Sequence, residues 1–317
     1  MATIKLIKCI SYACLLFVII SLIACFFLLT LYRVPTDSMA NTILPDDVIV
    51  VLKKTWEFED KTDSQLGAYN LDSKKPKQRT YNRIVNGDNL VFRADRSNLN
   101  VVKRCVGIPG DTIRIFNAVL SVNSKRELNN WALYDYRMIA NGDTVNLWRV
   151  FMSLGISKSQ ISQVKKGSFV LTLTECTAQK LMKTRFCKRI NKIVKLGGNN
   201  AYIFPNNKKS SWSRDNYGPL IVPKKGQILF LNSLTYPIYE NLILLEGHSV
   251  KKWKDKFVID NKISGCYEVS NNYYFVMGDN RDRSNDSRWT GFVSSEQIIG
   301  KVIFVLRARW PFIFFTN

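Results

Sequence analysis

The stretch Val101-Val-Lys-Arg-Cys-Val-Gly-Ile-Pro-Gly-Asp111 places a lysine inside a run of strand-forming residues. Two valines precede Lys103, and the β-rich run ends at the turn Gly107-Ile-Pro-Gly110. We therefore predict a strand over residues 100–106 that has an apolar face and buries Lys103. Burial disfavours the charged ammonium, so it lowers the pKa of a lysine from about 10.4 towards neutrality. A neutral lysine can act as a base.

Strand-like runs on both sides of this stretch predict a mainly β fold. Short apolar runs bounded by turn residues are typical of buried strands. Between the first two runs, residues 54–85 are polar and basic, which predicts an exposed loop. The expected strands are Val48–Leu52, Asn89–Arg93, a strand and hairpin over Thr112–Val122, Tyr273–Met277 and Lys301–Leu306.

Ser38 supplies the second half of the candidate chemistry. It precedes Met39 and lies six residues beyond an apolar run that ends at Tyr32. A serine hydroxyl is a poor nucleophile until a base accepts its proton, and the single histidine, His248, has no motif around it. Lys103 is therefore the better candidate base. Most serines and lysines are surface residues, so neither Ser38 nor Lys103 is a specific signal by itself. Together, the two residues predict a membrane-anchored Ser-Lys hydrolase.

The run from Cys9 to Tyr32 contains no charged residue and predicts a transmembrane anchor. As a helix it reaches about 36 Å, and a bilayer core is about 30 Å thick. A buried helix is one alternative; a cleaved signal peptide is another, although its apolar region is about 7–15 residues long. Lys5 and Lys8 precede the run and Arg33 follows it, which favours residues 1–8 in the cytoplasm and a catalytic body outside.

The net charge of +21 comes from 46 basic and 25 acidic residues, and the excess is concentrated in residues 116–269. No nucleic-acid-binding motif accompanies it, and the charges are scattered along the chain. Attraction to anionic membrane lipid is the functional interpretation, and a solvated surface is the alternative. We therefore expect lipid, and no nucleic acid, as a partner. The tail Trp310-Pro-Phe-Ile-Phe-Phe315 either lies in the membrane interface or packs as a strand.

Seven cysteines and one histidine argue against a metal centre. Because no Cys-x-x-Cys pair is present, we expect no zinc site and no cofactor. Cys105 follows Lys103 by two residues and is interpreted as a core residue. Cys176 and Cys187 could form a disulfide in an oxidising compartment, which the sequence leaves open.

Four motifs follow one another in the chain in a fixed order. They are Pro35-Thr-Asp-Ser-Met39, Gly87-Asp88, Lys103-Arg-x-Val-Gly-x-Pro-Gly-Asp111 and Gly278-Asp-Asn-Arg-Asp-x-Ser-x-Asp-Ser-Arg288. In these motifs the chain resembles the bacterial type I signal peptidases, membrane-bound endopeptidases that remove signal peptides from exported proteins. The last two motifs are long and specific. The resemblance covers about a third of the chain, roughly residues 33–53, 85–114 and 272–309.

The resemblance implies a role for each residue of the dyad. Ser38 is expected to be the nucleophile and Lys103 the general base. The oxyanion hole is expected to use the backbone N–H of Ser38 and the hydroxyl of Thr36, two residues earlier. Thr36 as a simple turn residue is the alternative.

The resemblance also implies support for the dyad from the last motif. Ser284 matches a serine that hydrogen-bonds the lysine amine, and Asp286 and Arg288 match a pair that braces the loop. Val276 and Met277 resemble apolar residues that pack near the lysine and desolvate it. The neighbouring residues Asp279, Asn280 and Arg281 are interpreted as architectural, because a loop so rich in charge needs internal partners.

Three positions depart from the family pattern. Asn41 stands where proline is common, and Asp46 stands where glycine is common, although Pro45 can supply the turn. Trp289-Thr-Gly291 differs from the residues that usually follow the arginine of the last motif in the family. These departures concern the loops and leave the residues of the dyad unchanged.

The expected architecture is mainly β, with an antiparallel-sheet core of the kind shared by signal peptidases and LexA-like proteases. This core comprises residues 33–115 and 270–317, follows one N-terminal transmembrane helix over 9–32, and contains residues 116–269 as an inserted second domain. Within the insert we expect short helices over 146–166 and 177–195 and strands over 201–205 and 228–231.

The expected function is cleavage of exported preproteins at small-x-small sites, at the outer face of the inner membrane. An extended peptide can add as a strand beside a sheet edge, with 35–39, 48–51 and 101–103 as the expected walls. Alternatives within enzymes are a LexA-like Ser-Lys protease and a maturation protease dedicated to one secretion or conjugation system. An inactive membrane scaffold is the alternative from another class.

Overall fold

The computed structural model describes most of the chain after the apolar run. The described residues are 11–12, 15–17, 19, 27–54, 83–94, 99–127, 130–141, 144–196, 202–206, 211–254, 256–307 and 313–315. The fold is mainly β and its sheets are built from antiparallel pairs, as the sequence predicts.

The largest sheet in the described part of the chain has eight strands and carries the candidate dyad strand near its middle. In this sheet β4 pairs with β3 on one side and with β18 on the other, and both pairs are antiparallel. The strands expected outside the predicted insert are confirmed to within a few residues. In spatial order the strands are β1 (Leu29–Arg33), β2 (Val48–Lys53), β20 (Ile298–Leu306), β3 (Asn89–Arg93), β4 (Asn100–Gly107), β18 (Tyr273–Met277) and β19 (Val293–Ser294), while β21 (Ile313–Phe315) pairs with β20.

The N-terminal side of this sheet corrects the expected extent of the anchor. Residues Leu29–Arg33 form β1 and pair with β2, so the end of the predicted helix 9–32 is a strand. The alternation in Leu-Thr-Leu-Tyr suits a pleated strand, and the partner β2 supplies the ladder that a helix prediction cannot include. No helix among the described residues is long and apolar enough to cross a membrane. Most of 9–26 lies outside the described residues, as do all of 1–8 and most of the predicted loop 54–85.

A second sheet packs against the first through a shared hydrophobic core. Its order is β12 (Tyr217–Ile221), β5 (Thr112–Phe116), β6 (Val119–Val122) and β7 (Lys125–Arg126). Ile113 and Leu220 of this sheet are buried in the same cluster as Phe275 and Met277 of β18. This core therefore contains residues from both sides of position 116, and the predicted division into a catalytic domain and an inserted domain stays a prediction.

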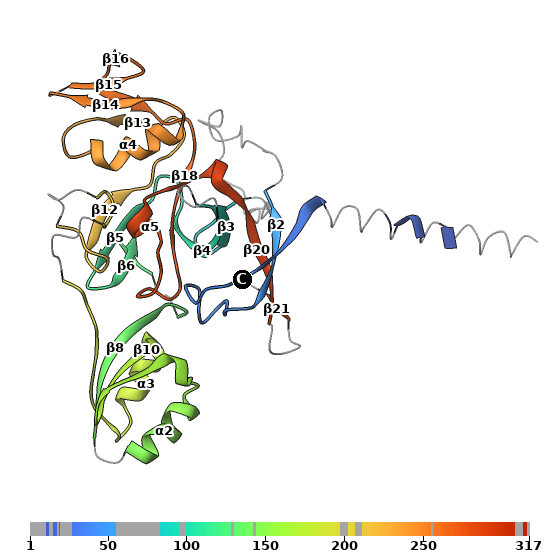
Figure 1. Ribbon diagram of the computed structural model, residues 1–317, viewed down its shortest axis with the longest axis vertical. Helices are drawn as coiled ribbons and strands as arrows, with labels where there is room; N and C mark the ends of the chain where they lie inside the picture. The colour runs from blue at the N-terminus through green and yellow to red at the C-terminus, as the bar shows by residue number, and fades with distance from the viewer. Residues whose placement is uncertain are drawn as a thin grey trace, which may run out of the picture.

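A third unit, drawn at the bottom of Figure 1, has a hydrophobic core of its own. Its sheet has the order β11 (Cys187–Lys192), β8 (Leu133–Ala140), β10 (Ser168–Thr174) and β9 (Ile161–Lys165), with α2 (Thr144–Ser153) and α3 (Glu175–Met182) beside it. Alternate residues of β10, Phe169, Leu171 and Leu173, are buried in this core.

Both helices predicted in this unit are shorter than expected. Helix α2 ends at Ser153, close to Gly155, whose positive φ of 72° stops helical geometry. The later part of the helix expected over 146–166 is a short 3-10 helix, Lys158–Gln160, followed by β9. Helix α3 ends at Met182, and the rest of the predicted 177–195 helix is β11. Both replaced segments pair with strands of the same sheet, which local periodicity does not reveal.

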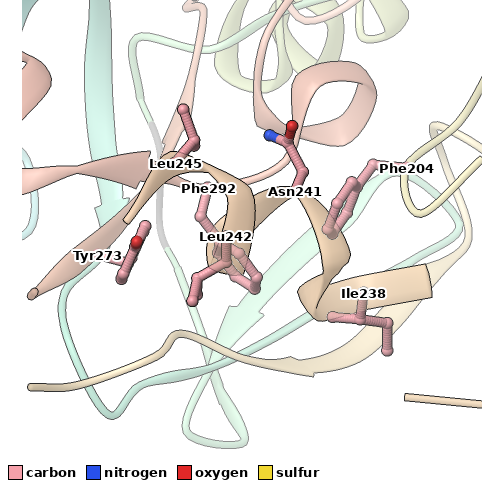
Figure 2. Close-up of a pocket in the computed structure, with 7 residues that line it drawn as sticks. All are labelled: Phe204, Ile238, Asn241, Leu242, Leu245, Tyr273 and Phe292. Carbon is pink, nitrogen blue, oxygen red and sulfur yellow. The ribbon is translucent and has the colours of Figure 1, made fainter. Parts of the chain in front are cut away.

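A fourth unit, drawn at the top of Figure 1, contributes buried residues of α4 (Tyr236–Leu245) and of several strands to the same core as the second sheet. Its strands are β13 (Ile228–Phe230), β14 (Val250–Trp253), β15 (Lys256–Ile259), β16 (Lys262–Ile263) and β17 (Cys266–Glu268). Figure 2 shows α4 over a small pocket lined by Phe204, Ile238, Asn241, Leu242, Leu245, Tyr273 and Phe292. None of the candidate catalytic residues lines this pocket.

The strand expected over 201–205 is wrong, and the one expected over 228–231 is confirmed as β13. Residues 202–206 form turns, because Pro205 has no N–H for a ladder and Phe204 packs edge-on against Phe292. In the tail, β21 pairs with β20, and contact of the tail with a membrane stays a prediction.

The described cysteines are free. Cys105 is fully buried on β4, which confirms the core interpretation. Cys176 and Cys187 do not form the disulfide that the sequence left open.

Candidate active site

Lys103 lies on β4, between the neighbouring strands β3 and β18, and is buried. Lys103 pairs with Leu90 of β3, and its side chain and backbone together are only 3% exposed, so the prediction of a buried lysine is confirmed. Burial is the main influence on its amine and lowers the pKa of Lys103 from 10.5 to about 8. The negative charges of Asp286 and Asp279 act in the opposite direction. The amine is therefore partly neutral near neutral pH.

Ser38 lies in a turn that brings its hydroxyl to this amine. Lys103 Nζ is 2.8 Å from Ser38 Oγ and also donates to Val102 O at 3.0 Å. The Ala40 N–H donates to Asp37 O at 2.9 Å and closes the turn around Ser38. The tertiary fold thus brings together two residues that are 65 positions apart in the chain.

Thr36 presents a hydroxyl to the same serine. Its Oγ1 is 3.3 Å from Ser38 Oγ, and Thr36 is exposed whereas Ser38 is buried. The hydroxyl of Thr36 therefore lies where an incoming substrate can reach it. This position is compatible with donation to an oxyanion that forms beside Ser38 Oγ.

The loop 278–288 holds the backbone of the serine turn. The Asn280 N–H donates to Ser38 O at 3.0 Å, and Asn280 Nδ2 donates to Asp37 O at 3.1 Å. Gly278 lies so close to the turn that a Cβ there would meet Ser38 O at 2.5 Å and Ser284 Oγ at 2.3 Å. A glycine is needed at 278 because the loop and the serine turn are in direct contact.

Asp286 and Arg288 form a fully buried pair inside this loop. Arg288 Nε and Nη2 donate to the two carboxylate oxygens of Asp286, each at 2.9 Å, and the Gly278 N–H donates to Asp286 at 3.1 Å. Burial by itself raises the pKa of Asp286, but the charge and hydrogen bonds of Arg288 outweigh it and hold that pKa below its usual value. The carboxylate is therefore ionised and fixed at the base of the loop.

Ser284 does not make the contact that the resemblance implies. Its Oγ is buried and has no hydrogen-bond partner in the described structure, so the expected bond to Lys103 Nζ is not formed. The hydroxyl lies close enough to Asp286 to help lower the pKa of that carboxyl, without hydrogen-bonding geometry. The amine of Lys103 instead uses Ser38 and its own strand as partners.

A second buried ion pair joins the loop to β4, and the sequence analysis did not identify it. Arg104 Nε and Nη2 donate to Asp279 at 2.8 and 2.7 Å, and Arg104 Nη1 donates to Gly87 O at 2.6 Å. The guanidinium also lies over the ring of Trp131, 4.7 Å from its centroid. The sequence contained one signal for this pair, the position of Arg104 directly after Lys103 in one motif. Because neighbouring residues of a strand point to opposite faces, Arg104 needs partners other than those of Lys103.

Two departures from the family pattern have a conformational explanation. Asn41 has a φ of 90°, which the ring of proline does not allow, and Asp46 has a φ of 71°, where glycine is tolerated better than most residues. The preference for glycine at the position of Asp46 therefore follows from the backbone. Asp46 is held by its N–H, which donates to Val34 O at 2.7 Å, and by an ion pair with Arg33 at 2.9 Å.

His248 is engaged elsewhere in the molecule. It follows α4, and its Nδ1 lies 2.6 Å from Asp260 Oδ2. Within the described ranges, no group of three or more His, Cys, Asp or Glu residues is placed to hold a metal ion.

Comparison with known proteins gives consistent matches. The family model of signal peptidase, peptidase S26, matches residues 4–308. Signal peptidase I of Buchnera aphidicola subsp. Baizongia pistaciae is 25% identical over 289 residues, which cover 88% of this chain and 72% of that protein. Signal peptidase I of Buchnera aphidicola subsp. Schizaphis graminum is 23% identical, over 85% of this chain and 65% of that protein, or just under two thirds of its length. Signal peptidase I of Rickettsia typhi is 25% identical, over 93% of this chain and 78% of that protein.

The family match thus extends over almost the whole chain, well beyond the four motifs. The chain therefore belongs to the signal peptidase family, peptidase S26, the serine endopeptidases that remove signal peptides from exported proteins.

Proposed function

We propose that this signal peptidase cleaves its substrate with a dyad of Ser38 and Lys103. The observation that carries the proposal is the 2.8 Å distance between Lys103 Nζ and Ser38 Oγ in a buried site. A lysine with a pKa of about 8 can be neutral at the working pH and still gain a proton readily.

The proposed reaction follows from this geometry. The neutral amine of Lys103 accepts the hydroxyl proton of Ser38 while Oγ bonds to the scissile carbonyl carbon. The ammonium that forms then gives this proton to the leaving amine as the peptide bond breaks. In the second half, the free amine accepts a proton from the water that attacks the ester carbonyl. The ammonium then returns this proton to Ser38 Oγ as the ester bond breaks and the acid product leaves.

The oxyanion formed in both halves needs hydrogen-bond donors beside Ser38. We assign this role to the Ser38 backbone N–H and the Thr36 hydroxyl, whose Oγ1 is 3.3 Å from Ser38 Oγ. Such donors act mainly on the transition state, and loss of one typically costs about 2.7–4 kcal/mol.

The loop residues have supporting roles in this proposal. Asp286 and Arg288 hold the loop through their buried ion pair. Ser284 is also assigned a supporting role, because its side chain lies beside Gly278 and close to Asp286. This role does not include a hydrogen bond from its hydroxyl to Lys103.

The substrate and location are proposed from the family and the sequence together. We infer that the substrates carry small-x-small cleavage sites and bind as an extended strand beside 35–39, 48–51 and 101–103. We also infer a single-pass anchor over the part of the apolar run that precedes β1, with the catalytic body on the outer face of the inner membrane. The basic region 116–269, considered as an inserted domain, adds attraction to anionic lipid.

Substitution of either dyad residue should abolish cleavage of a preprotein. We expect Ser38→Ala and Lys103→Met each to reduce kcat by several orders of magnitude, and the double variant to be no slower than either single one, because the pair acts as a unit. The assay is cleavage of a generic preprotein by full-length enzyme in detergent. His248→Ala is the control and should remain active. A Ser38→Ala enzyme with near-normal turnover would remove the dyad from the mechanism.

The pH dependence should report the amine of Lys103. Its pKa of about 8 means that the amine is protonated, and unable to accept the serine proton, at lower pH. The value of kcat/KM should therefore rise about tenfold per pH unit below pH 8 and level off above it. A pH-rate profile of the wild type measures this, with His248→Ala giving the same profile. An acid limb near pH 6.5 that disappears in His248→Ala would point to a histidine base instead.

Thr36 should affect the chemical step more than substrate binding. Thr36→Val removes the hydroxyl at nearly constant shape, so kcat should fall by about 100-fold with little change in KM. Thr36→Ser keeps the hydroxyl and should be mild. Steady-state kinetics on a preprotein peptide distinguish the two variants. If Thr36→Val changes KM alone, the residue shapes the cleft and does not stabilise the oxyanion.

The topology is tested by protease protection in spheroplasts. Protease added from outside should digest the body after Arg33 and spare a tag placed before residue 1, because Lys5 and Lys8 favour a cytoplasmic N-terminus. Immunoblots of the tag and the body give the result, and a cytoplasmic protein serves as the control for intact membranes. Digestion of the body only after membrane disruption would contradict the proposed orientation.

A further inference from the structure

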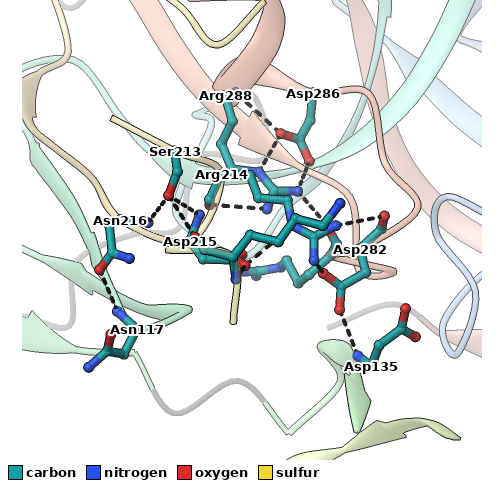
Figure 3. A network of polar contacts seen from close by, with 11 residues as sticks. Asn117, Asp135, Ser213, Arg214, Asp215, Asn216, Asp282, Asp286 and Arg288 are labelled. Carbon is teal, nitrogen blue, oxygen red and sulfur yellow. Dashed lines mark hydrogen bonds and ion pairs between the residues drawn. The ribbon is translucent and has the colours of Figure 1, made fainter. Parts of the chain in front are cut away.

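Arg214 lies outside the four motifs but contacts the catalytic loop directly. It precedes β12, in the segment 211–216, and is 11% exposed at its side chain. Its Nη2 forms an ion pair with Asp282 Oδ1, and its Nη1 donates to Asp282 O at 3.3 Å. Its Nε donates to the neighbouring Asp215 Oδ2 at 3.3 Å. Figure 3 shows the side chain of Arg214 within this network of carboxylates.

Asp282 is the member of the catalytic loop that receives these contacts. It is 4% exposed at its side chain, and its Oδ2 also accepts the N–H of Asp135 on β8 at 2.6 Å. Burial is the largest influence on Asp282 and raises the pKa of its carboxyl, while the Asp135 N–H and Arg214 favour the ionised form. Loss of Arg214 therefore leaves a buried carboxylate without its cation.

The segment that carries Arg214 is itself fixed to the rest of the molecule. Asp215 Oδ2 accepts the Lys195 N–H at 2.7 Å, and Asp215 O accepts the Ala118 N–H at 2.9 Å. Arg214 O accepts from Arg288 Nη1 at 3.5 Å. Arg214 thus touches the catalytic loop at two places, at Asp282 and at the arginine of the buried brace.

The loop transmits these contacts to the dyad over a few residues. Asn280, two residues before Asp282, donates its N–H to Ser38 O. Asp286, four residues after it, accepts the Gly278 N–H, and Gly278 is in contact with the serine turn. Displacement of the loop at Asp282 would therefore disturb the packing around the Ser38 turn, where Asp279 and Asp286 lie near enough to act on the charge of Lys103, and would let water approach the amine.

We propose that Arg214 and Asp282 are a positioning pair for the signal peptidase reaction, which holds the loop 278–288 against the Ser38 turn and keeps Lys103 dehydrated. The inference rests on the proposed Ser38–Lys103 function. It assigns a role in catalysis to a residue from the predicted insert, a region whose role the motifs leave open. The pair acts through the loop and does not touch the reacting atoms.

The test compares full-length variants of this pair with a variant of a surface ion pair outside the loop. Asp282→Asn is nearly isosteric, and its amide oxygen can still accept the Asp135 N–H. Arg214→Gln removes the charge and keeps a shorter polar side chain. Each should lower kcat/KM about 10- to 100-fold, mainly through kcat, since small displacements of catalytic groups have effects of this size. Arg214→Lys keeps one charge and should recover part of the loss. The double variant should be no slower than the slower single variant.

The control is Arg126→Ala, which breaks the pair of Arg126 with Glu175 at 2.9 and 3.1 Å. This pair is half exposed and does not contact the loop, so the variant should cleave at the wild-type rate. Ser38→Ala is measured in parallel. If it remains active, the proposed function fails, whatever the Arg214 variants do.

A second readout separates positioning from loss of folded protein. Water that enters beside Lys103 restores its hydration and raises its pKa, with Asp279 and Asp286 as the charged groups that also favour the ammonium. The acid limb of the pH profile should therefore move upward by about one pH unit in Arg214→Gln and Asp282→Asn. Unchanged kcat/KM, or a loss explained by the folded fraction with an unmoved acid limb, would overturn the proposal. If Arg214→Gln does not fold, Asp282→Asn decides by the same criteria.

Discussion

The burial of Lys103 is the constraint on which the site depends. An amine on a surface strand would stay protonated near neutral pH, whereas on β4, 3% exposed, its pKa falls to about 8. The strand can carry a lysine at this position because the amine has two partners, Ser38 Oγ and Val102 O, so that its hydrogen-bonding capacity is largely used. The same burial brings the serine and the amine into a site with little water.

The carboxylates near the lysine would defeat this effect if they were unpaired. Asp279 and Asp286 both favour the charged amine, but each is bonded by an arginine, Arg104 and Arg288 respectively. Because each pair has a net charge near zero, the attraction of the carboxylates for the ammonium is weakened and desolvation dominates. The two buried pairs thus allow a loop rich in acidic residues to lie near a lysine whose pKa is lowered to about 8.

Ion pairs and hydrogen bonds also connect the loop to several other parts of the molecule. Arg104 joins the loop to β4, Asn280 joins it to the serine turn, and Asp282 joins it to Arg214 and to β8. Breaking one partner of a buried pair is far more costly than losing a surface pair, so these contacts resist displacement. The large region between the motifs is therefore structurally connected to the site, although most of it lies in separate sheets.

The sequence by itself predicted the strands β2, β3, β4, β18 and β20 of the central sheet, because apolar runs between turns are local patterns, and the four motifs pointed to the candidate dyad through the family resemblance. Only the tertiary structure decided that Leu29–Arg33 is a strand and that the second halves of two predicted helices are β9 and β11, since their ladder partners are distant in sequence. It likewise decided that Ser284 Oγ has no bond to Lys103, and that Arg104 and Arg214 meet the acidic loop. Side-chain contacts between residues that are 68 or 175 positions apart in the chain depend on packing, and local propensity does not predict them.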